Sequence, residues 1–140
     1  TIYKKMGENE KALKQYDLLE AREDLVSYEV FLNRAIAQKM SGDALSALGD
    51  INKAIALKPQ SATLYKVRGN IHILLNNYFE SVNDYTKAIE LNNEFAEAYF
   101  NRGIANILAQ NRTEACLDFE RSLALGYEDG AEKLKYFCSF

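Results

Sequence analysis

Three arginines stand 34 residues apart along this chain, at positions 34, 68 and 102. A guanidinium group binds carboxylates through two parallel hydrogen bonds, so such a row could grip an acidic ligand or hold a fold together. An aspartate follows each arginine 16 positions later. In an antiparallel helix pair, two residues lie level when the turn falls midway between them, and the three midpoints are Gly42, Asn76 and Gln110. We therefore favour structural ion pairs over a ligand-binding row. The predicted pairs are Arg34 with Asp50, Arg68 with Asp84, and Arg102 with Asp118.

Other residues that could carry chemistry are few. The single histidine, His72, has no nearby cysteine or carboxylate pattern, which is typical of a packing or surface residue rather than a catalyst. The sequence contains no phosphate-binding loop, dinucleotide fingerprint or nucleophile motif, and its two cysteines do not make a zinc site. We expect no enzymatic activity, no cofactor and no metal.

Cys116 and Cys138 are expected to lie level across the last helical hairpin, because their midpoint, Tyr127, falls in the turn Gly-Tyr-Glu-Asp-Gly. They form either a disulfide, which requires an oxidising compartment, or a pair of buried thiols. We favour reduced thiols, since the spacing between packed helices usually exceeds the reach of a disulfide. Reduced thiols favour the cytoplasm, whereas paired cysteines would indicate a periplasmic or secreted protein.

Composition narrows the class of protein. Hydrophobic residues make up 48% of the 140 residues and charged residues 26%, as in an ordinary globular protein. The net charge of -3 and the scattered basic residues do not indicate nucleic acid as a partner. No apolar run approaches the roughly 20 residues that span a membrane. The chain begins at Thr1 rather than methionine, which leaves open whether it is part of a longer protein.

The elements that must position these residues follow from an internal repeat. Residues 28–61, 62–95 and 96–129 align without a gap, and one proline with few glycines indicates an almost wholly helical chain. Each copy is expected to form two helices. The first helices are predicted at about 28–41, 62–75 and 96–109, and the second at about 44–57, 78–91 and 112–125.

Small and large residues share columns in this alignment. An aromatic residue is followed four positions later by a small one, and the second helix has a small residue, a bulky one four further on, and another small one. In the first copy these are Phe31, Ala35, Ala47, Ile51 and Ala54, with Pro59 near the end. The pattern resembles the tetratricopeptide repeat (TPR) family. It departs from that family by having arginine in the usual leucine column and Gln38, His72 and Asn106 in a usual tyrosine column.

The resemblance implies an all-α, right-handed α-solenoid of stacked antiparallel helix pairs with a C-terminal capping helix. We expect a single TPR domain over 1–140, with a partial repeat at 1–27, three full repeats and a cap at 130–140 whose Leu134 and Phe137 pack inward. An N-terminal helix at about 8–23 is a candidate surface for self-association or for contact with upstream sequence. Its apolar residues are Ala12, Leu13, Tyr16 and Leu19.

The resemblance also implies that the first helix of each repeat lines a concave groove. Its apolar residues and amides suit an extended peptide or a partner helix. The groove candidates are Leu32, Asn33, Ile36, Lys66, Asn70, Ile73, Phe100, Asn101 and Ile104, with Glu29, Lys39, Glu97 and Ile107 beside them. We therefore expect a non-catalytic module that binds a protein or peptide. The alternative is a structural segment of a longer TPR protein, or a self-assembly module.

Some TPR co-chaperone domains hold the terminal carboxylate of a chaperone tail in a clamp of five residues. Lys66, Asn70 and Asn101 match the first three clamp positions. The other two fall near Ala131 and Lys135, so that one basic residue is missing. This function is the less favoured one.

Overall fold

A computed structural model describes residues 27–139 of the chain. Those residues form helices and turns and contain no strand. The proposed N-terminal partial repeat, apart from Ser27, and Phe140 lie outside the described residues. The helices are α2 (Tyr28–Met40), α3 (Ala44–Leu57), α4 (Ala62–Leu74), α5 (Tyr78–Leu91), α6 (Ala96–Leu108), α7 (Arg112–Ala124) and α8 (Asp129–Phe137).

The turns inside the three repeats share one conformation. Their central residues, Gly42, Asn76 and Gln110, all have positive φ, at 90°, 61° and 66°. A left-handed residue after a helix allows the next backbone N–H to reach back to the last turn. The N–H of Asn77 accordingly donates to the carbonyl of His72 at 2.8 Å, and the turns at Asp43 and Asn111 have the same bond. The residues predicted as the midpoints of the turns are therefore the ones that reverse the chain.

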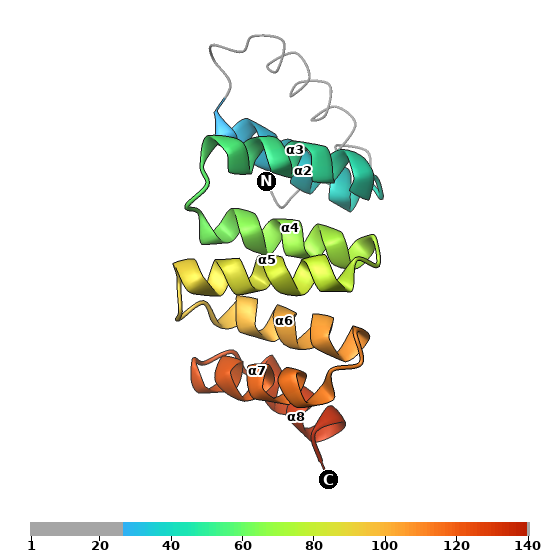
Figure 1. Ribbon diagram of the computed structural model, residues 1–140, viewed down its shortest axis with the longest axis vertical. Coiled ribbons are helices and arrows are strands. Elements are labelled where there is room, and N and C mark those ends of the chain that lie inside the picture. Colours follow the sequence, from blue (N-terminus) through green and yellow to red (C-terminus); the bar gives the residue numbers. More distant parts are fainter. Residues whose placement is uncertain (1–26, 140) are drawn as a thin grey trace.

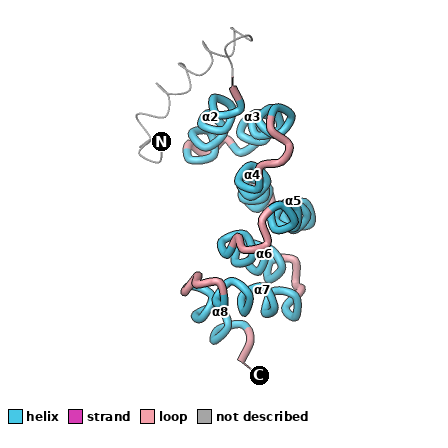
Figure 2. The backbone as a smooth tube through the Cα atoms, turned by 90° about the vertical axis from the view of Figure 1, so that its left-hand side faces the viewer, coloured by secondary structure: helices cyan, strands magenta, loops and turns pink. Residues whose placement is uncertain are grey.

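The helices lie in two layers, and the helix pairs follow one another along the length of the molecule. Each repeat is an antiparallel pair, α2 with α3, α4 with α5, and α6 with α7, and α8 packs on α7 (Figure 1). Figure 2 shows α2, α4 and α6 along the hollow side of a bowed row, with α3, α5 and α7 behind them. The predicted all-helical array of stacked helix pairs is confirmed.

Small and large side chains fit together between the two helices of each repeat. Tyr85 and Phe119 are fully buried, and each ring lies against a glycine of the facing helix. A Cβ atom on Gly69 would come within 2.6 Å of the Tyr85 ring, and one on Gly103 within 2.5 Å of the Phe119 ring. In the first repeat, Ala35 takes the place of the glycine and Ile51 the place of the aromatic ring. The residue with the extra methyl group thus faces a smaller side chain. The alternation is thus a volume match inside every pair.

The structure brings each of the three arginines to its aspartate. Arg34 donates from Nε and Nη2 to the two carboxylate oxygens of Asp50, at 2.6 and 2.5 Å. Arg68 forms the same fork with Asp84 at 2.9 and 2.8 Å, and Arg102 with Asp118 at 2.9 and 2.7 Å. All three aspartates are buried, with relative exposures of 4–6%. These bidentate contacts join the first helix of each repeat, which lies on the hollow side, to its second helix.

Two of the arginines also reach the preceding repeat, a contact that the sequence pattern does not predict. Nη1 of Arg68 donates to Asn52 of α3 at 3.1 Å, and Nη1 of Arg102 donates to Thr86 of α5 at 3.1 Å. One guanidinium group therefore connects three helices. The hydrogen bond to Asp84 raises the pKa of Arg68 further above its ordinary value. Its charge is thus used within the fold.

Helix α8 covers the end of the array. Gly130 is buried, and a Cβ atom there would lie 2.7 Å from Oγ of Ser122 and 2.8 Å from the carbonyl oxygen of Phe119. Leu134 and Phe137 are half-buried, and the ring of Phe137 stacks on that of Phe119 with centroids 6.4 Å apart. The helix spans Asp129–Phe137, so it begins one residue before the cap predicted at 130–140 and ends three residues before the end of that range.

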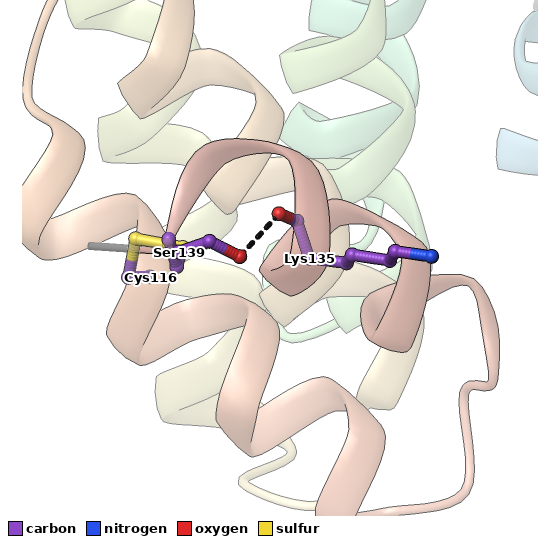
Figure 3. The surroundings of a disulfide bond; sticks show 4 residues. Cys116, Lys135 and Ser139 are labelled. Atoms are coloured by element: carbon purple, nitrogen blue, oxygen red, sulfur yellow. Dashed lines mark hydrogen bonds between the residues drawn. A yellow bond between two sulfur atoms is a disulfide. The ribbon is translucent and has the colours of Figure 1, made fainter.

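The cysteines are paired, so the expectation of reduced thiols is wrong. Cys116 of α7 forms a disulfide with Cys138, and their Cα atoms are 5.9 Å apart (Figure 3). Packed helix axes usually lie about 8–10 Å apart, which was the reason for expecting thiols. Two features shorten the distance here: Gly130 lets α8 approach α7 closely, and Cys138 lies just beyond the end of α8.

Candidate functional site

The inner helices α2, α4 and α6 each carry three of the nine groove candidates. All nine side chains are half-buried, as expected for residues on the hollow face of a layer that also packs against its neighbours. Contacts between α2 and α4 and between α4 and α6 keep the three helices adjacent. The backbone therefore presents these candidates on consecutive helices.

A cavity of about 320 Å³ opens between the inner helices. Four of the groove candidates line it, namely Asn70, Ile73, Asn101 and Ile104, together with Lys39, Leu74 and Tyr85. Leu74 and Tyr85 were absent from the sequence-based set, and Tyr85 stands in the bulky column of the second helices, 34 residues after Ile51. Leu32, Asn33 and Ile36 lie outside the lining of this cavity, and Leu32 packs against the hydrophobic core.

The lining is arranged in two rows that cross the helices. Lys39, Asn70 and Asn101 form a polar row, and Ile73 and Ile104 form an apolar one. Successive members of a row are 31 residues apart, three fewer than the repeat length. Because three residues make about one helical turn, each row moves nearly one turn back on each successive helix. This spacing was the available signal for the cavity, and an alignment in 34-residue columns hides it.

Hydrogen bonds fix the amides of the polar row. The hydroxyl of Tyr85 donates to Oδ1 of Asn70 at 2.5 Å, and Nδ2 of Asn101 donates to the same oxygen at 3.1 Å. Burial raises the pKa of Tyr85 well above its ordinary value, so the hydroxyl remains a donor. Within residues 27–139, the N–H groups of the Asn70 side-chain amide and the oxygen of the Asn101 side-chain amide stay unbonded. The row thus offers both donors and an acceptor.

Charged groups lie beside the cavity. Nζ of Lys66 is 2.5 Å from Oε1 of Glu97, and these side chains are 20% and 38% exposed. Lys39 is half-buried and has no hydrogen bond or ion pair within the described part of the chain. Burial and the nearby charge of Lys66 lower the pKa of Lys39, against an opposing effect of Glu97. Glu97 is therefore bonded to Lys66, and it acts on Lys39 only through its charge.

The carboxylate-clamp positions are engaged with other groups of the chain. Lys66 is paired with Glu97, and the amides of Asn70 and Asn101 are bonded to one another. Ala131 and Lys135, the nearest counterparts of the other two positions, are both exposed on α8. The side chain of Lys135 extends away from the disulfide in Figure 3. A free carboxylate at Lys66 would meet the like charge of Glu97.

Phe100, the remaining aromatic candidate, serves the cap. Its ring lies 5.6 Å from that of Phe119 and 4.9 Å from that of Tyr127, measured between centroids. The aromatic groups close the end of the array at α8. The groove candidate Phe100 is therefore partly used in packing.

His72 lies beside the second ion pair, in the column that also holds Asn106. Its Nε2 atom is 3.7 Å from Oδ2 of Asp84, and Nδ1 is 3.3 Å from Nδ2 of Asn77. Asn106 donates to Asp118 at the corresponding place, at 3.2 Å.

None of the helices between residues 27 and 139 is long and apolar enough to cross a membrane.

Comparisons with known proteins agree with this geometry. A family model described as a TPR repeat matches residues 69–107. No curated protein matches the chain in sequence. Among solved structures, the first TPR of Spaghetti (RPAP3) bound to the HSP90 peptide SRMEEVD superposes with a TM-score of 0.77 at 23% identity. That match covers 80% of this chain and 90% of the other.

Two further structures are similar. The crystal structure of MamA has a TM-score of 0.80 at 20% identity and covers 86% of this chain and 70% of its own. The second TPR domain of human RPAP3, in complex with the HSP70 peptide SGPTIEEVD, has a TM-score of 0.72 at 25% identity. It covers 77% of this chain and 92% of that domain. The resemblance to the tetratricopeptide repeat family is confirmed, and residues 27–139 have the all-helical TPR fold.

Proposed function

We propose that this protein binds an extended peptide segment of a partner protein in the concave groove, without catalysis. The observation that carries the proposal is the cavity between α2, α4 and α6. Its apolar row can take a side chain, while its polar row offers an amide donor and an amide acceptor to a peptide backbone. Sites of this kind, mostly apolar with a few placed polar groups, are typical of ligand binding.

The dimensions suit an extended chain that runs along the stack. Neighbouring helices in contact lie about 10 Å apart, and an extended chain advances about 3.3 Å per residue. One helix is therefore passed every three residues or so. Asn70 and Asn101, on consecutive inner helices, are spaced to contact backbone amides of one continuous segment. Contacts to the backbone would hold many sequences, and the cavity would select among them.

The similar structures support a peptide as the class of ligand. The RPAP3 domains carry the peptides SRMEEVD and SGPTIEEVD. The carboxylate-clamp alternative is less favoured, because Glu97 is paired with Lys66, the lysine that matches the first clamp position. Within residues 27–139, no contact favours a purely structural segment over a binding module.

A displayed library of random peptides, selected against the full 140-residue chain, tests the proposal. We expect enriched peptides to lose at least about tenfold in affinity, roughly 1.4 kcal/mol, when Ile73→Ser or Ile104→Ser makes the cavity polar. Leu45→Ser is the matched control, since Leu45 is an exposed leucine, at 72%, outside this cavity. Failure to enrich any peptide, or equal losses in the control, would contradict the proposal.

We also infer an oxidising compartment for this chain, because the disulfide between Cys116 and Cys138 supports one. Alkylation of the unfolded, unreduced protein followed by mass measurement tests this. Two unmodified cysteines are expected in protein isolated from its native source. Two alkylated cysteines would contradict the inference.

A further inference from the structure

Lys39 is the unusual group of the groove. It lies on α2 at the start of the polar row, is half-buried, and forms no ion pair within residues 27–139. A partly desolvated ammonium group is destabilised unless a counter-charge or several acceptors surround it. The carboxylate whose charge acts on Lys39, that of Glu97, is already bonded to Lys66. The groove therefore holds a positive charge that the described residues leave unneutralised.

The cavity that Lys39 lines is also lined by aliphatic side chains. Ile73 and Ile104 belong to its apolar row, and Leu74, which is 56% exposed, extends the apolar surface at the rim. Among residues 27–139, no aromatic ring other than that of Tyr85 lines it, and the Tyr85 hydroxyl is bound to Asn70. A branched aliphatic side chain fits such a lining without leaving a buried polar group unpaired.

From these features, and resting on the proposed peptide-binding function, we infer the class of segment that the groove recognises. It is an internal extended segment with one acidic side chain, which pairs with Lys39, and one aliphatic side chain, which enters the cavity of Ile73 and Ile104. Side chains on one face of an extended chain occur at every second residue. Because both contacts line one cavity, the two residues are two or four positions apart in the ligand.

The inference places the ligand's charge at Lys39 rather than at the clamp. Lys66 and the two asparagines are bonded to groups of the chain, so a terminal carboxylate finds no free cation there. The acidic group belongs to a side chain, and the ligand continues past the groove at both ends. The terminus of the ligand then contributes nothing to affinity.

A library of random peptides flanked on both sides, displayed to the full chain, tests this class. Enriched sequences are expected to combine Asp or Glu with Leu, Ile, Val or Met two or four positions away. For one such peptide, replacing Glu by Gln should weaken binding about tenfold, as should Lys39→Met. The two changes together should weaken binding no more than either alone, because they remove the same contact.

Two controls keep the outcomes distinct. Lys87→Met removes a lysine from the outer helix α5 and should leave affinity unchanged. A free and an amidated C-terminus on the peptide should bind equally. Peptides that are enriched but tolerate Glu→Gln, or that require a free C-terminus, overturn this inference and leave the proposed function standing. A selection that enriches no peptide at all overturns both.

Discussion

The interior of the helix pairs and the surface of the groove are built on different spacings. Inside the pairs, residues of one kind return every 34 positions, as with the arginines and their aspartates. Along the groove, Lys39, Asn70 and Asn101 follow one another at intervals of 31 residues, and the side chain changes from an ammonium group to an amide. The interior thus repeats the same side-chain contacts in each repeat, whereas the groove forms a single surface to which different repeats contribute different side chains. Changes in the interior should affect stability, and changes in the groove should affect binding.

The largest effect is expected from breaking the most buried ion pair. Arg34 and Asp50 are each 5% exposed in their side chains, so Asp50→Ala removes both hydrogen bonds that the buried guanidinium donates to Asp50. We expect a loss of about 3–5 kcal/mol in the free energy of unfolding, measured by urea denaturation. Asp84→Ala should cost less, because the Arg68 side chain is 26% exposed, against 5% for Arg34. Equal losses at the two sites would contradict this ranking.

Removing the disulfide should loosen one end of the array. The bridge closes a loop with a sequence separation of 22, for which chain entropy predicts a loss of about 3 kcal/mol in the Cys116→Ser/Cys138→Ser protein. Amide hydrogen exchange should quicken in α8, which packs on α7, and remain slow in α4 and α5. Uniform faster exchange through all helices would show that the bridge stabilises the whole array instead of its cap.

A single methyl group tests the volume match of the interior. Gly103→Ala should cost about 1–3 kcal/mol in spite of alanine's better helix propensity, since the new Cβ meets the buried Phe119 ring. Adding Phe119→Ile reproduces the pairing of Ala35 with Ile51 in the first repeat and should recover part of the loss. Thermal denaturation of the two variants checks both statements. A stabilised Gly103→Ala protein would show that the ring moves aside without strain.

The smallest effect concerns protonation in the groove. The pKa of Lys39 is expected below its ordinary 10.5, because of burial and of the charge on Lys66. Glu97→Gln removes an attractive charge and should lower the pKa further, and Lys66→Met should raise it. Because the folded state lowers this pKa, the contribution of Lys39 to stability rises with pH between the folded and unfolded values. Nitrogen-detected NMR titration of Lys39 measures the direction. A pKa above 10.5 in the unmodified chain would contradict the described charges.

Much of the fold could be predicted from the sequence, since each repeat supplies the same signals independently. The helix bounds, the turns at Gly42, Asn76 and Gln110, and the small–large columns follow from patterns that short-range geometry enforces. The disulfide could not be predicted, because the close approach at Gly130 depends on how α8 docks on α7. Contacts between repeats, such as Arg68 with Asn52, likewise depend on the stacking.

The candidate site was predicted only in part. The inner faces of the helices gave Asn70, Ile73, Asn101 and Ile104, which line the cavity. The bond between Lys66 and Glu97 was not anticipated, because it joins residues 31 apart on different helices. Tyr85 lies mostly in the core, and only its hydroxyl reaches Asn70. Which of the half-buried candidates share one cavity is decided by the twist of the stack.

Chemical-shift mapping of the full chain with a peptide selected by display tests the central claim most directly. If the groove is the binding site, the largest shifts will occur at the side-chain amides of Asn70 and Asn101 and at the methyl groups of Ile73 and Ile104. The outer helices α3 and α7 will shift little. Shifts concentrated on those outer helices, with the two asparagine amides unchanged, would contradict the account.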